Sequence, residues 1–535
     1  MYLNRNIYLI LFLFLMGCKD KNVIVSVTQP VIPVLTLKET NPVLKIELKR
    51  GRPIDYSIKQ IDLSLSGTND IGDVQSVQLF QSDENGEFST KNQIWETLSA
   101  ASRITFKGNF PVKADTLGFW VSVKLKNKID LTHRIHISCQ NILTDRGIVD
   151  LPSDQSSNDL RVGVALRQND QDHINTSRIP GLATSKEGTL LAVCDARRES
   201  SRDLQGNIDV ILQSSTDGGQ SWQPLQVILD RGKWGGLPEK FNGISDACIL
   251  VDEQTGAIFV AGLWMYGVLD DNGQWINGLT EESTVWKHQW MEKGSQPGFG
   301  VKQTSQFLIT KSTDDGLTWN DPINITPTNK KKEWWLYAPA PGHGITLSDG
   351  TLVFPTDGLD ENGVPFSNIT WSKDHGETWI TSNPAYKNTS ECMAVQLSDG
   401  SIMLNMRAGR QGRIVCTTRD LGETWVEHPT SEKTLIEPGC MASLHKHICH
   451  QDGEIKSILL FSNPNSKTDR DHITIKVSYD NGNTWPKDKW ILLDELSGRG
   501  YSCLTSVNDS VIGIFYECSQ ADIAFQEIPI KEFLK

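Results

Sequence analysis

The octapeptide Ser312-Thr313-Asp314-Asp315-Gly316-Leu317-Thr318-Trp319 indicates the fold of this chain. It places Asp two residues after a hydroxyl side chain, Gly two residues after the Asp, and a second hydroxyl residue followed by Trp at the end. The same pattern fills residues 215–222, 372–379, 418–425 and 478–485. Aspartate and hydroxyl groups bind turn amides, glycine allows a left-handed backbone, and tryptophan packs on the hairpin. The repeat therefore predicts five related turns whose aspartates are structural and not catalytic.

A second repeat, a turn followed by an apolar strand, predicts the number of structural units. It occurs at residues 187–193, 255–260, 349–354, 399–404, 454–461 and 508–515, and an octapeptide follows each of the first five copies. Such recurring short strands are typical of a β-propeller, whose blades bury their apolar faces against one another. We expect an all-β chain in which residues 160–535 form a six-bladed β-propeller. In each blade the turn joins strands A and B, and the octapeptide joins strands C and D.

The residues before the propeller alternate between apolar and polar side chains. Leu44, Ile46 and Leu48, for example, interleave with charged residues. This period of two is typical of half-buried antiparallel strands. Several such runs over residues 24–155 predict an N-terminal β-sandwich domain, and the polar stretch 151–159 is the expected linker.

The first 18 residues are predicted to be a leader segment and not part of the fold. An apolar run at residues 7–15 is too short for a transmembrane helix but fits a signal peptide. It ends in Leu15-Met16-Gly17-Cys18, which resembles the lipobox of bacterial lipoproteins. Cys18 is therefore the expected lipidation site, and the protein is expected in the cell envelope, anchored to the outer membrane on its periplasmic or surface face. Ordinary secretion is the alternative.

Bulk composition limits the classes of partner and cofactor. The 535 residues are too many for one ordinary core, and a net charge of −13 argues against nucleic acid as a partner. The cysteines form no CxxC pair, so we expect no metal site. Cys194, Cys248 and Cys416 fit small core residues. His445, His447 and His450 lack metal-ligand spacing and are interpreted as surface-loop residues.

Chain topology predicts where functional side chains meet. In each blade the start of strand A and the end of strand B face the same end of the propeller, opposite the octapeptides. Arg178 and Asp246 each stand ten residues before a turn glycine, while Glu391 stands nine before Gly400 and Tyr501 eight before Asp509. The ends of B strands and one B–C loop add further residues to this mouth: Asp195, Arg197, Arg407 and Arg470.

These residues, in this order, resemble the bacterial exo-α-sialidase family over roughly residues 160–535. The resemblance rests on Arg178-Ile179-Pro180, the five octapeptides, Ser390-Glu391-Cys392-Met393, Arg407, Arg470 and Gly500-Tyr501-Ser502. It implies a glycoside hydrolase that removes terminal sialic acid from glycoproteins, glycolipids or oligosaccharides with retention and without a cofactor. The N-terminal stretch is similar to the carbohydrate-binding-like sandwich that precedes some bacterial sialidases.

The resemblance also implies a carboxylate clamp made of Arg178, Arg407 and Arg470. Guanidinium groups suit this task because their paired N–H donors match a carboxylate and they stay charged at any relevant pH. The assignment of Arg470 leaves two alternatives, Arg413 and Arg499, which lie within reach of the same mouth.

For the chemistry, the resemblance implies Tyr501 as the nucleophile with Glu391 as its base. Asp203 is implied as the general acid and base, with Asp195 and Glu199 as its rivals.

Two further positions match family residues near the sugar. Arg197 and Asp246 are implied near its O4 and its acetamido nitrogen, either in contact or one layer behind. The region around Trp264 and Trp275 is a candidate wall for the N-acetyl methyl group.

Two other functions stay open from the sequence. The same site could serve a trans-sialidase-like or intramolecular reaction, and octapeptide propellers also occur as non-catalytic binders, here of sialylated glycans.

Overall fold

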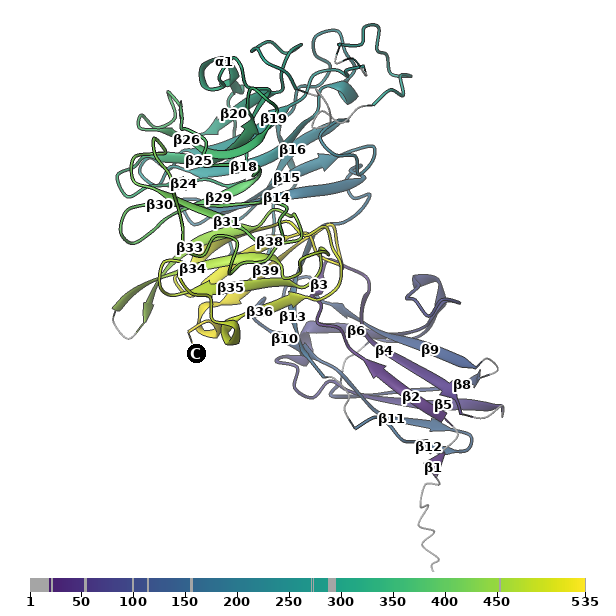
Figure 1. Cartoon of the computed structure of the whole chain (residues 1–535). Helices are drawn as coiled ribbons and strands as arrows, with labels where there is room; N and C mark the ends of the chain where they lie inside the picture. The colour runs from purple at the N-terminus through teal and green to yellow at the C-terminus, as the bar shows by residue number, and fades with distance from the viewer. Residues whose placement is uncertain are drawn as a thin grey trace, which may run out of the picture. The chain divides into compact units, whose positions relative to one another are not determined.

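The computed structural model describes residues 19–20, 23–51, 55–98, 101–112, 115–153, 157–270, 272, 274–286, 295–451 and 454–534. The predicted leader at residues 1–18, including Cys18, lies outside these residues. The described chain is nearly all β (Figure 1). Within this part, no helix is both long enough and apolar enough to cross a membrane.

The chain divides into two compact units whose segments interleave in the sequence. Unit 1 comprises Met1–Pro30, Glu39–Lys124 and Ile135–Asp159, and unit 2 comprises Val31–Lys38, Leu125–Arg134 and Leu160–Lys535. Two short N-terminal segments thus belong to unit 2, which a single linker near residue 155 does not predict. One reason is that β3 (Val34–Thr36) pairs in parallel with β13 (Asp159–Arg167).

Unit 1 contains two five-stranded sheets. The first has the order β1 (Lys19–Asp20), β12 (Gly147–Val149), β11 (Ser138–Thr144), β5 (Tyr56–Ser64) and β8 (Arg103–Val112). The second has the order β2 (Val23–Thr28), β4 (Asn41–Arg50), β9 (Thr116–Leu125), β6 (Val74–Gln81) and β7 (Gln93–Thr97). Aromatic rings join the two sheets, because Trp95 of β7 lies 4.3 Å from Phe106 of β8. Leu44, Ile46 and Leu48 are buried, as their alternation predicts.

Unit 2 is a β-propeller whose described strands form six sheets. The first has the strands β14 (Thr176–Thr184), β15 (Leu190–Arg197), β16 (Ile208–Ser215) and β17 (Gln226–Leu229). The second has β18 (Ile244–Val251), β19 (Ile258–Trp264), β20 (Gln306–Ser312) and β21 (Ile323–Asn324), with β23 (Gly342–His343) beside β18. The third is β22 (Leu336–Pro339), β24 (Ile345–Thr346), β25 (Leu352–Leu359), β26 (Pro365–Ser372), β27 (Ile380–Thr381) and β28 (Tyr386–Lys387). The short helix α1 (Thr326–Asn329) precedes it.

The remaining three sheets follow the same plan. The fourth is β29 (Cys392–Gln396), β30 (Ile402–Met406), β31 (Ile414–Thr418) and β32 (Val426–Glu427), and the fifth is β33 (Ser443–Gln451), β34 (Glu454–Pro464), β35 (Ile473–Ser478) and β36 (Ile491–Asp494). The sixth includes β37 (Ser502–Asn508), β38 (Val511–Tyr516), β39 (Ile523–Pro529) and β13, with β3 beside β13. A blade count of six stays a prediction that these sheets fit.

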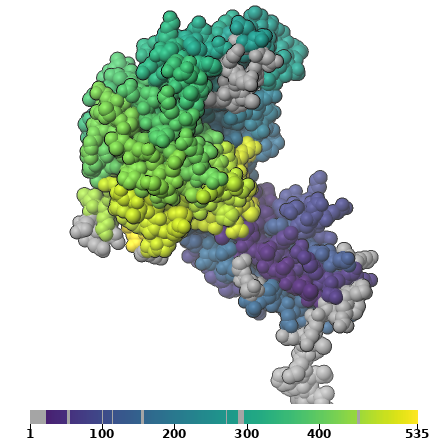
Figure 2. All heavy atoms as spheres, in the orientation of Figure 1, coloured from purple at the N-terminus to yellow at the C-terminus, as the bar shows by residue number. Residues whose placement is uncertain are grey.

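The sixth sheet joins the two ends of unit 2. Its strand β13 precedes the strands of the other five propeller sheets in the sequence and pairs antiparallel with β39 near the C-terminus. In Figure 2 the yellow C-terminal segments lie against the green segments of the same unit. Pairing of the two ends protects strand edges that would otherwise be exposed.

The octapeptides form the predicted turns. In the copy at 312–319, Asp314 accepts hydrogen bonds from Ser312 Oγ (2.8 Å), Thr318 N (2.9 Å) and Thr318 Oγ1 (2.5 Å). Gly316, with φ of +82°, donates its N–H to Ser312 Oγ at 3.0 Å. The aspartate contacts recur at Asp217, Asp374, Asp420 and Asp480.

The histidines expected in a loop lie in a strand, so that expectation is wrong. His445 and His447 belong to β33, and both rings bond to Ser506 Oγ at 2.8 Å. β33 forms a long antiparallel hairpin with β34, and the polar character of the histidines gave no sign of this strand. Cys194, Cys248 and Cys416 are buried, as predicted, and all nine cysteines in the described residues are free and buried.

Candidate active site

A cavity of about 310 Å³ lies at the predicted mouth of unit 2. The predicted site residues that line it are Arg178, Asp203, Asp246, Glu391, Arg407, Arg470 and Tyr501. Four further lining residues are Ile179, Leu204, Pro341 and Ser390, and a fifth is a carboxylic acid, Asp357. The structure therefore brings together side chains that lie up to about 320 residues apart in the sequence. None of the five octapeptide aspartates is among the lining residues.

Irregular backbone at the strand ends turns these side chains toward the mouth. Arg178 stands in β14 opposite Asp195, and the register shifts directly after it, where Ile179 has φ of +61°. In β18 a second register shift surrounds Asp246, which has φ of +58°. A non-glycine residue in the left-handed region is strained, and such residues concentrate at functional sites. The bulges thus aim one side chain from each of two neighbouring sheets at the cavity.

Tyr501, Glu391 and Arg407 form one hydrogen-bonded group. The Tyr501 hydroxyl donates to Glu391 Oε1, and Arg407 Nη1 donates to Glu391 Oε2 at 2.6 Å and to Tyr501 Oη at 3.1 Å. Burial, followed by the nearby Glu391 carboxylate, raises the pKa of Tyr501 well above its usual value. The same carboxylate raises the pKa of Arg407. The raised pKa keeps the Tyr501 phenol neutral, with its proton directed at the Glu391 carboxyl group.

Two more arginines flank the Tyr501 ring. The guanidinium carbons of Arg178 and Arg470 lie 5.4 and 5.6 Å from the ring centroid. Arg470 Nη1 donates to the carbonyl of Arg499 at 3.0 Å and Nη2 to that of Gly439 at 3.3 Å. Both flanking cations favour a phenolate on Tyr501 in the same way that they favour an anionic ligand.

The structure separates Arg470 from its two rivals. Arg413 is fully buried and forms an ion pair with Glu437 at 2.6 Å, which is also fully buried. Arg499 lines a different surface hollow with residues 497–498. Of the three arginines, only Arg470 is among the residues that line the active-site cavity.

Glu517, which the sequence did not indicate, holds Tyr501 and Arg178 in place. This fully buried carboxylate pairs with Arg178 Nε, accepts the N–H of Ile179 at 3.1 Å and, through Oε2, the N–H of Tyr501 at 3.0 Å. Burial disfavours the charge on Arg178, but Glu517 outweighs this and raises the pKa of Arg178. Glu517 directly follows a B strand, which is a position where the sequence already predicted functional residues.

Asp203 lies on the loop between β15 and β16, and about half of its side chain is exposed. Arg197 Nη2 donates to Asp203 Oδ1 at 2.5 Å and to Asp195 Oδ2 at 3.2 Å. Arg197 is 1% exposed and is not among the lining residues, so the structure places it behind Asp203. Asp195 is fully buried and also accepts the N–H of Asp246 at 3.1 Å, so it orients neighbouring groups from behind the cavity wall.

Two buried carboxylic acids complete the lining. Burial, followed by repulsion from Asp195 and Asp203, raises the pKa of Asp246 well above its usual value. Burial and then Glu391 do the same to Asp357. A raised pKa favours the protonated form of both groups, and a protonated carboxylic acid can donate a hydrogen bond. Asp357 was missed, although it stands seven residues after a turn glycine, as do Asp195 and Arg407.

The aromatic residues considered as a wall for the N-acetyl methyl group lie elsewhere. Trp264 is 1% exposed and packs edge-on against Trp234, and Trp275 packs against Tyr266. Neither is among the residues that line the cavity.

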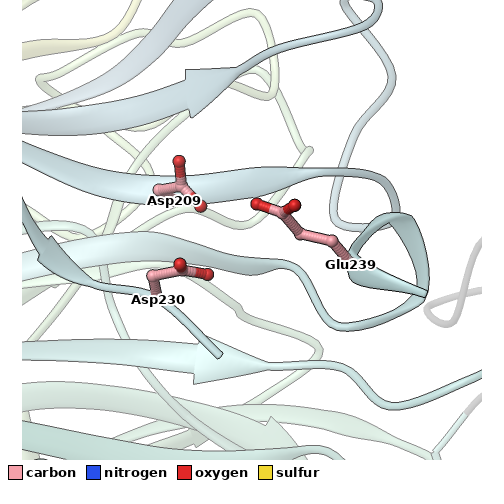
Figure 3. A group of neighbouring side chains, drawn as sticks. All are labelled: Asp209, Asp230 and Glu239. Atoms are coloured by element: carbon pink, nitrogen blue, oxygen red, sulfur yellow. The ribbon is translucent and has the colours of Figure 1, made fainter. Parts of the chain in front are cut away.

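Among the described residues, one group of carboxylates has its ligand atoms close enough to share a metal ion. Asp209, Asp230 and Glu239 each place one oxygen within 4.8 Å of the others (Figure 3). Arg198 Nε already donates to Asp209 Oδ2 at 2.5 Å, so one cation of the chain itself neutralises part of this charge. None of the three lines the active-site cavity.

Two protein families match separate parts of the chain. The family described as "BNR repeat-like domain" matches residues 179–487. The family described as "N-terminal domain of BNR-repeat neuraminidase" matches residues 23–147.

Individual relatives extend the match over almost the whole chain. A sialidase of Bacteroides fragilis (strain YCH46) is 37% identical over 515 residues, which cover 94% of this chain and 91% of the relative. A sialidase of Paraclostridium sordellii is 30% identical and covers 64% of this chain and 81% of the relative. Among solved structures, the Hadza microbial sialidase Hz136 is 33% identical with a TM-score of 0.85, covering 94% of this chain and 99% of that one.

Proposed function

This chain belongs to the sialidase (neuraminidase) family with BNR repeats, and from that premise we infer that it is an exo-sialidase, a glycoside hydrolase that removes terminal sialic acid from glycans. The cavity supports action on a terminal sugar. Its volume of about 310 Å³ is at the small end of ligand pockets, roughly 300–1,000 Å³, and suits one monosaccharide. Three arginines on its wall suit the carboxylate that distinguishes sialic acid from neutral sugars.

For the first chemical step, we propose that Tyr501 attacks the anomeric carbon. A bond forms between Tyr501 Oη and this carbon while the glycosidic C–O bond breaks. The phenolic proton passes to Glu391, and Asp203 gives its proton to the leaving oxygen. Arg178, Arg407 and Arg470 hold the sugar carboxylate, and Arg407 also stabilises the developing phenolate.

In the second step water cleaves the covalent intermediate. Asp203, now ionised, takes a proton from the water, whose oxygen attacks the anomeric carbon. The bond to Tyr501 Oη breaks, and the phenolate recovers its proton from Glu391. Two displacements on opposite faces retain the configuration of the sugar.

A tyrosine suits this reaction better than the usual carboxylate nucleophile. The anomeric carbon of sialic acid carries a carboxylate, and a second carboxylate about 4 Å away would face repulsion of roughly 4 kcal/mol at an effective dielectric of 20. A neutral phenol avoids that repulsion. The observation that carries the proposal is the hydrogen bond from the Tyr501 hydroxyl to Glu391, with Arg407 bound to both.

The test combines a substitution with product analysis. Tyr501→Phe should lower turnover of a fluorogenic sialoside by roughly 10³-fold or more while the fold persists. Tyr337→Phe, which removes a buried hydroxyl bonded to Thr356 and Thr370, should stay near wild-type activity. Wild-type enzyme treated with a 2,3-difluorinated sialic acid should gain one glycosyl mass on the peptide that contains Tyr501.

Three outcomes would contradict parts of the proposal. Near wild-type turnover by Tyr501→Phe would remove Tyr501 from its role. An anhydro or transferred product in place of free sialic acid would indicate the trans-sialidase-like alternative. Binding of sialosides without any product would indicate a non-catalytic propeller.

We also propose that Cys18 carries a lipid that anchors the enzyme in the cell envelope, on the basis of the lipobox-like sequence. The full-length protein made in a bacterial host should partition into detergent, and Cys18→Ala should move it to the aqueous phase. Equal partitioning of both would contradict the anchor.

A further inference from the structure

The loop that carries Asp203 contacts an aromatic side chain outside the cavity. The Arg202 guanidinium carbon lies 3.8 Å from the ring centroid of Trp286. Trp286 in turn stacks on Phe241 at 5.2 Å and 30°, and Phe241 is only 3% exposed. Trp286 is thus fixed from the core side and presents its ring to the residue next to Asp203. A guanidinium on an indole face is a favourable and geometrically specific contact.

The residues on the other side of Asp203 contact the same region. Leu204 has φ of +57°, is 2% exposed and packs with Leu263 and Met265. Gln205 Nε2 donates to the Gly267 carbonyl at 3.2 Å.

Gly267 is itself tied to the aromatic group, since its N–H donates to the Phe241 carbonyl at 2.8 Å. Leu263, Met265, Gly267 and Trp286 therefore contact Arg202, Leu204 and Gln205, and Asp203 stands between these contacts.

We infer that Trp286 is a positioning residue for the general acid: through Arg202 it holds the Asp203 loop so that the carboxyl reaches the leaving oxygen. The inference rests on the proposed function. Proton transfer needs the acid within hydrogen-bond reach, and a misplacement of about 1 Å can cost roughly 10²-fold in rate. Arg197 binds the Asp203 carboxyl from behind, but about half of the Asp203 side chain is exposed, so the position of its loop also depends on the contacts of the neighbouring residues.

Substrates with different leaving groups distinguish a positioning role from a purely structural one, because a structural role would lower kcat/KM on both substrates alike. An alcohol leaving group, as in sialyllactose, needs protonation, whereas a good phenolate leaving group, as in methylumbelliferyl sialoside, needs it much less. The value of kcat/KM reports the first chemical step for both substrates. Trp286→Ala should lower kcat/KM by roughly 10- to 100-fold on sialyllactose and by less than about threefold on the aryl sialoside. Trp286→Phe keeps a ring under Arg202 and should restore most of the loss.

Three variants serve as references. Asp203→Ala should show the same split between substrates with a larger loss, about 10²- to 10⁴-fold on sialyllactose. Trp371→Ala removes another indole that lies under a cation, Lys373 at 5.5 Å, and should leave both substrates at wild-type rates. Arg202→Met removes the cation but leaves Trp286 in place, and it should also lower kcat/KM more on sialyllactose than on the aryl sialoside. This variant tests the positioning role even if Trp286→Ala fails to fold.

The outcomes separate this inference from the proposed function. Equal losses on both substrates, or none on either, in Trp286→Ala and Arg202→Met would overturn the positioning role while leaving Asp203 as the acid. If Asp203→Ala itself shows no split, the assignment of Asp203 fails and this inference fails with it.

Discussion

Replacing Glu517 with Gln is expected to destabilise unit 2 by about 3–5 kcal/mol and to weaken substrate capture. Three donors converge on this fully buried carboxylate: Arg178 Nε and Ile179 N on Oε1, and Tyr501 N on Oε2. A glutamine offers one oxygen and one NH₂ group. In either orientation of the amide, at least one buried N–H of the protein faces another donor.

The magnitude follows from these contacts. An unsatisfied buried N–H costs about 1–3 kcal/mol, and Arg178, only 13% exposed, loses its charge partner as well. Removing one member of a buried ion pair costs about 3–5 kcal/mol in total. With an unfolding entropy near 2.1 cal/mol/K per residue and a unit of roughly 400 residues, the melting temperature should fall by about 4–6 °C. Loss of a fixed guanidinium, worth about 1.5–3 kcal/mol, should raise KM for sialyllactose by roughly 10- to 100-fold.

The assay compares thermal melting and steady-state kinetics for Glu517→Gln and a matched control, Glu437→Gln. Glu437 is also fully buried, pairs with Arg413 at 2.6 Å and accepts the N–H groups of Ala408 and Gly409 at 2.7 and 2.8 Å. The control should lose comparable stability but show a smaller change in KM, because Arg413 does not line the cavity. The reasoning is refuted if Glu517→Gln melts within about 1 °C of wild type or raises KM no more than the control does.

Two further predictions concern stability. Ser372→Ala should lower the free energy of unfolding by about 1–3 kcal/mol, because the buried hydroxyl accepts the Gly376 N–H at 2.9 Å. It should leave kcat/KM unchanged. Thermal melting and a sialoside assay check this prediction, and a lower kcat/KM at unchanged stability would contradict it. Burial, with repulsion from Asp130 and Asp217, raises the pKa of Glu527 from 4.5 to about 7. Its contribution to stability is therefore fully present below pH 4.5 and lost as pH rises through about 7, so Glu527→Gln should show a smaller fall in melting temperature between about pH 5 and pH 8. An equal fall in variant and wild type would contradict that assignment.

Several features could be predicted because their interactions are local or periodic. The recurring aspartate of each octapeptide forms its hydrogen bonds within those eight residues, so the pattern of Asp314 and Thr318 is visible in the sequence itself. The ends of strands face the same mouth in every blade, which places Arg178 and Tyr501 together without coordinates. The same counting could have found Asp357, since it shares its offset from a turn glycine with Arg407.

Other features depend on contacts between sheets that no local pattern encodes. The choice of Arg470 over Arg413 follows from the burial of Arg413 against Glu437, a residue 24 positions away. The contact of Arg202 with Trp286 joins a loop of the first sheet to a segment that follows β19 of the second.

By itself, the sequence determined the repeat and the all-β character, because short-range hydrogen bonds and strand periodicity are properties of neighbouring residues. It also indicated most of the charged side chains at the mouth, through the offsets of strand ends from the turns. Only the tertiary structure decided which of these side chains face the cavity and which lie behind it. Burial and electrostatic pairing depend on residues far apart in the chain, as Glu517 demonstrates by holding both Arg178 and Tyr501.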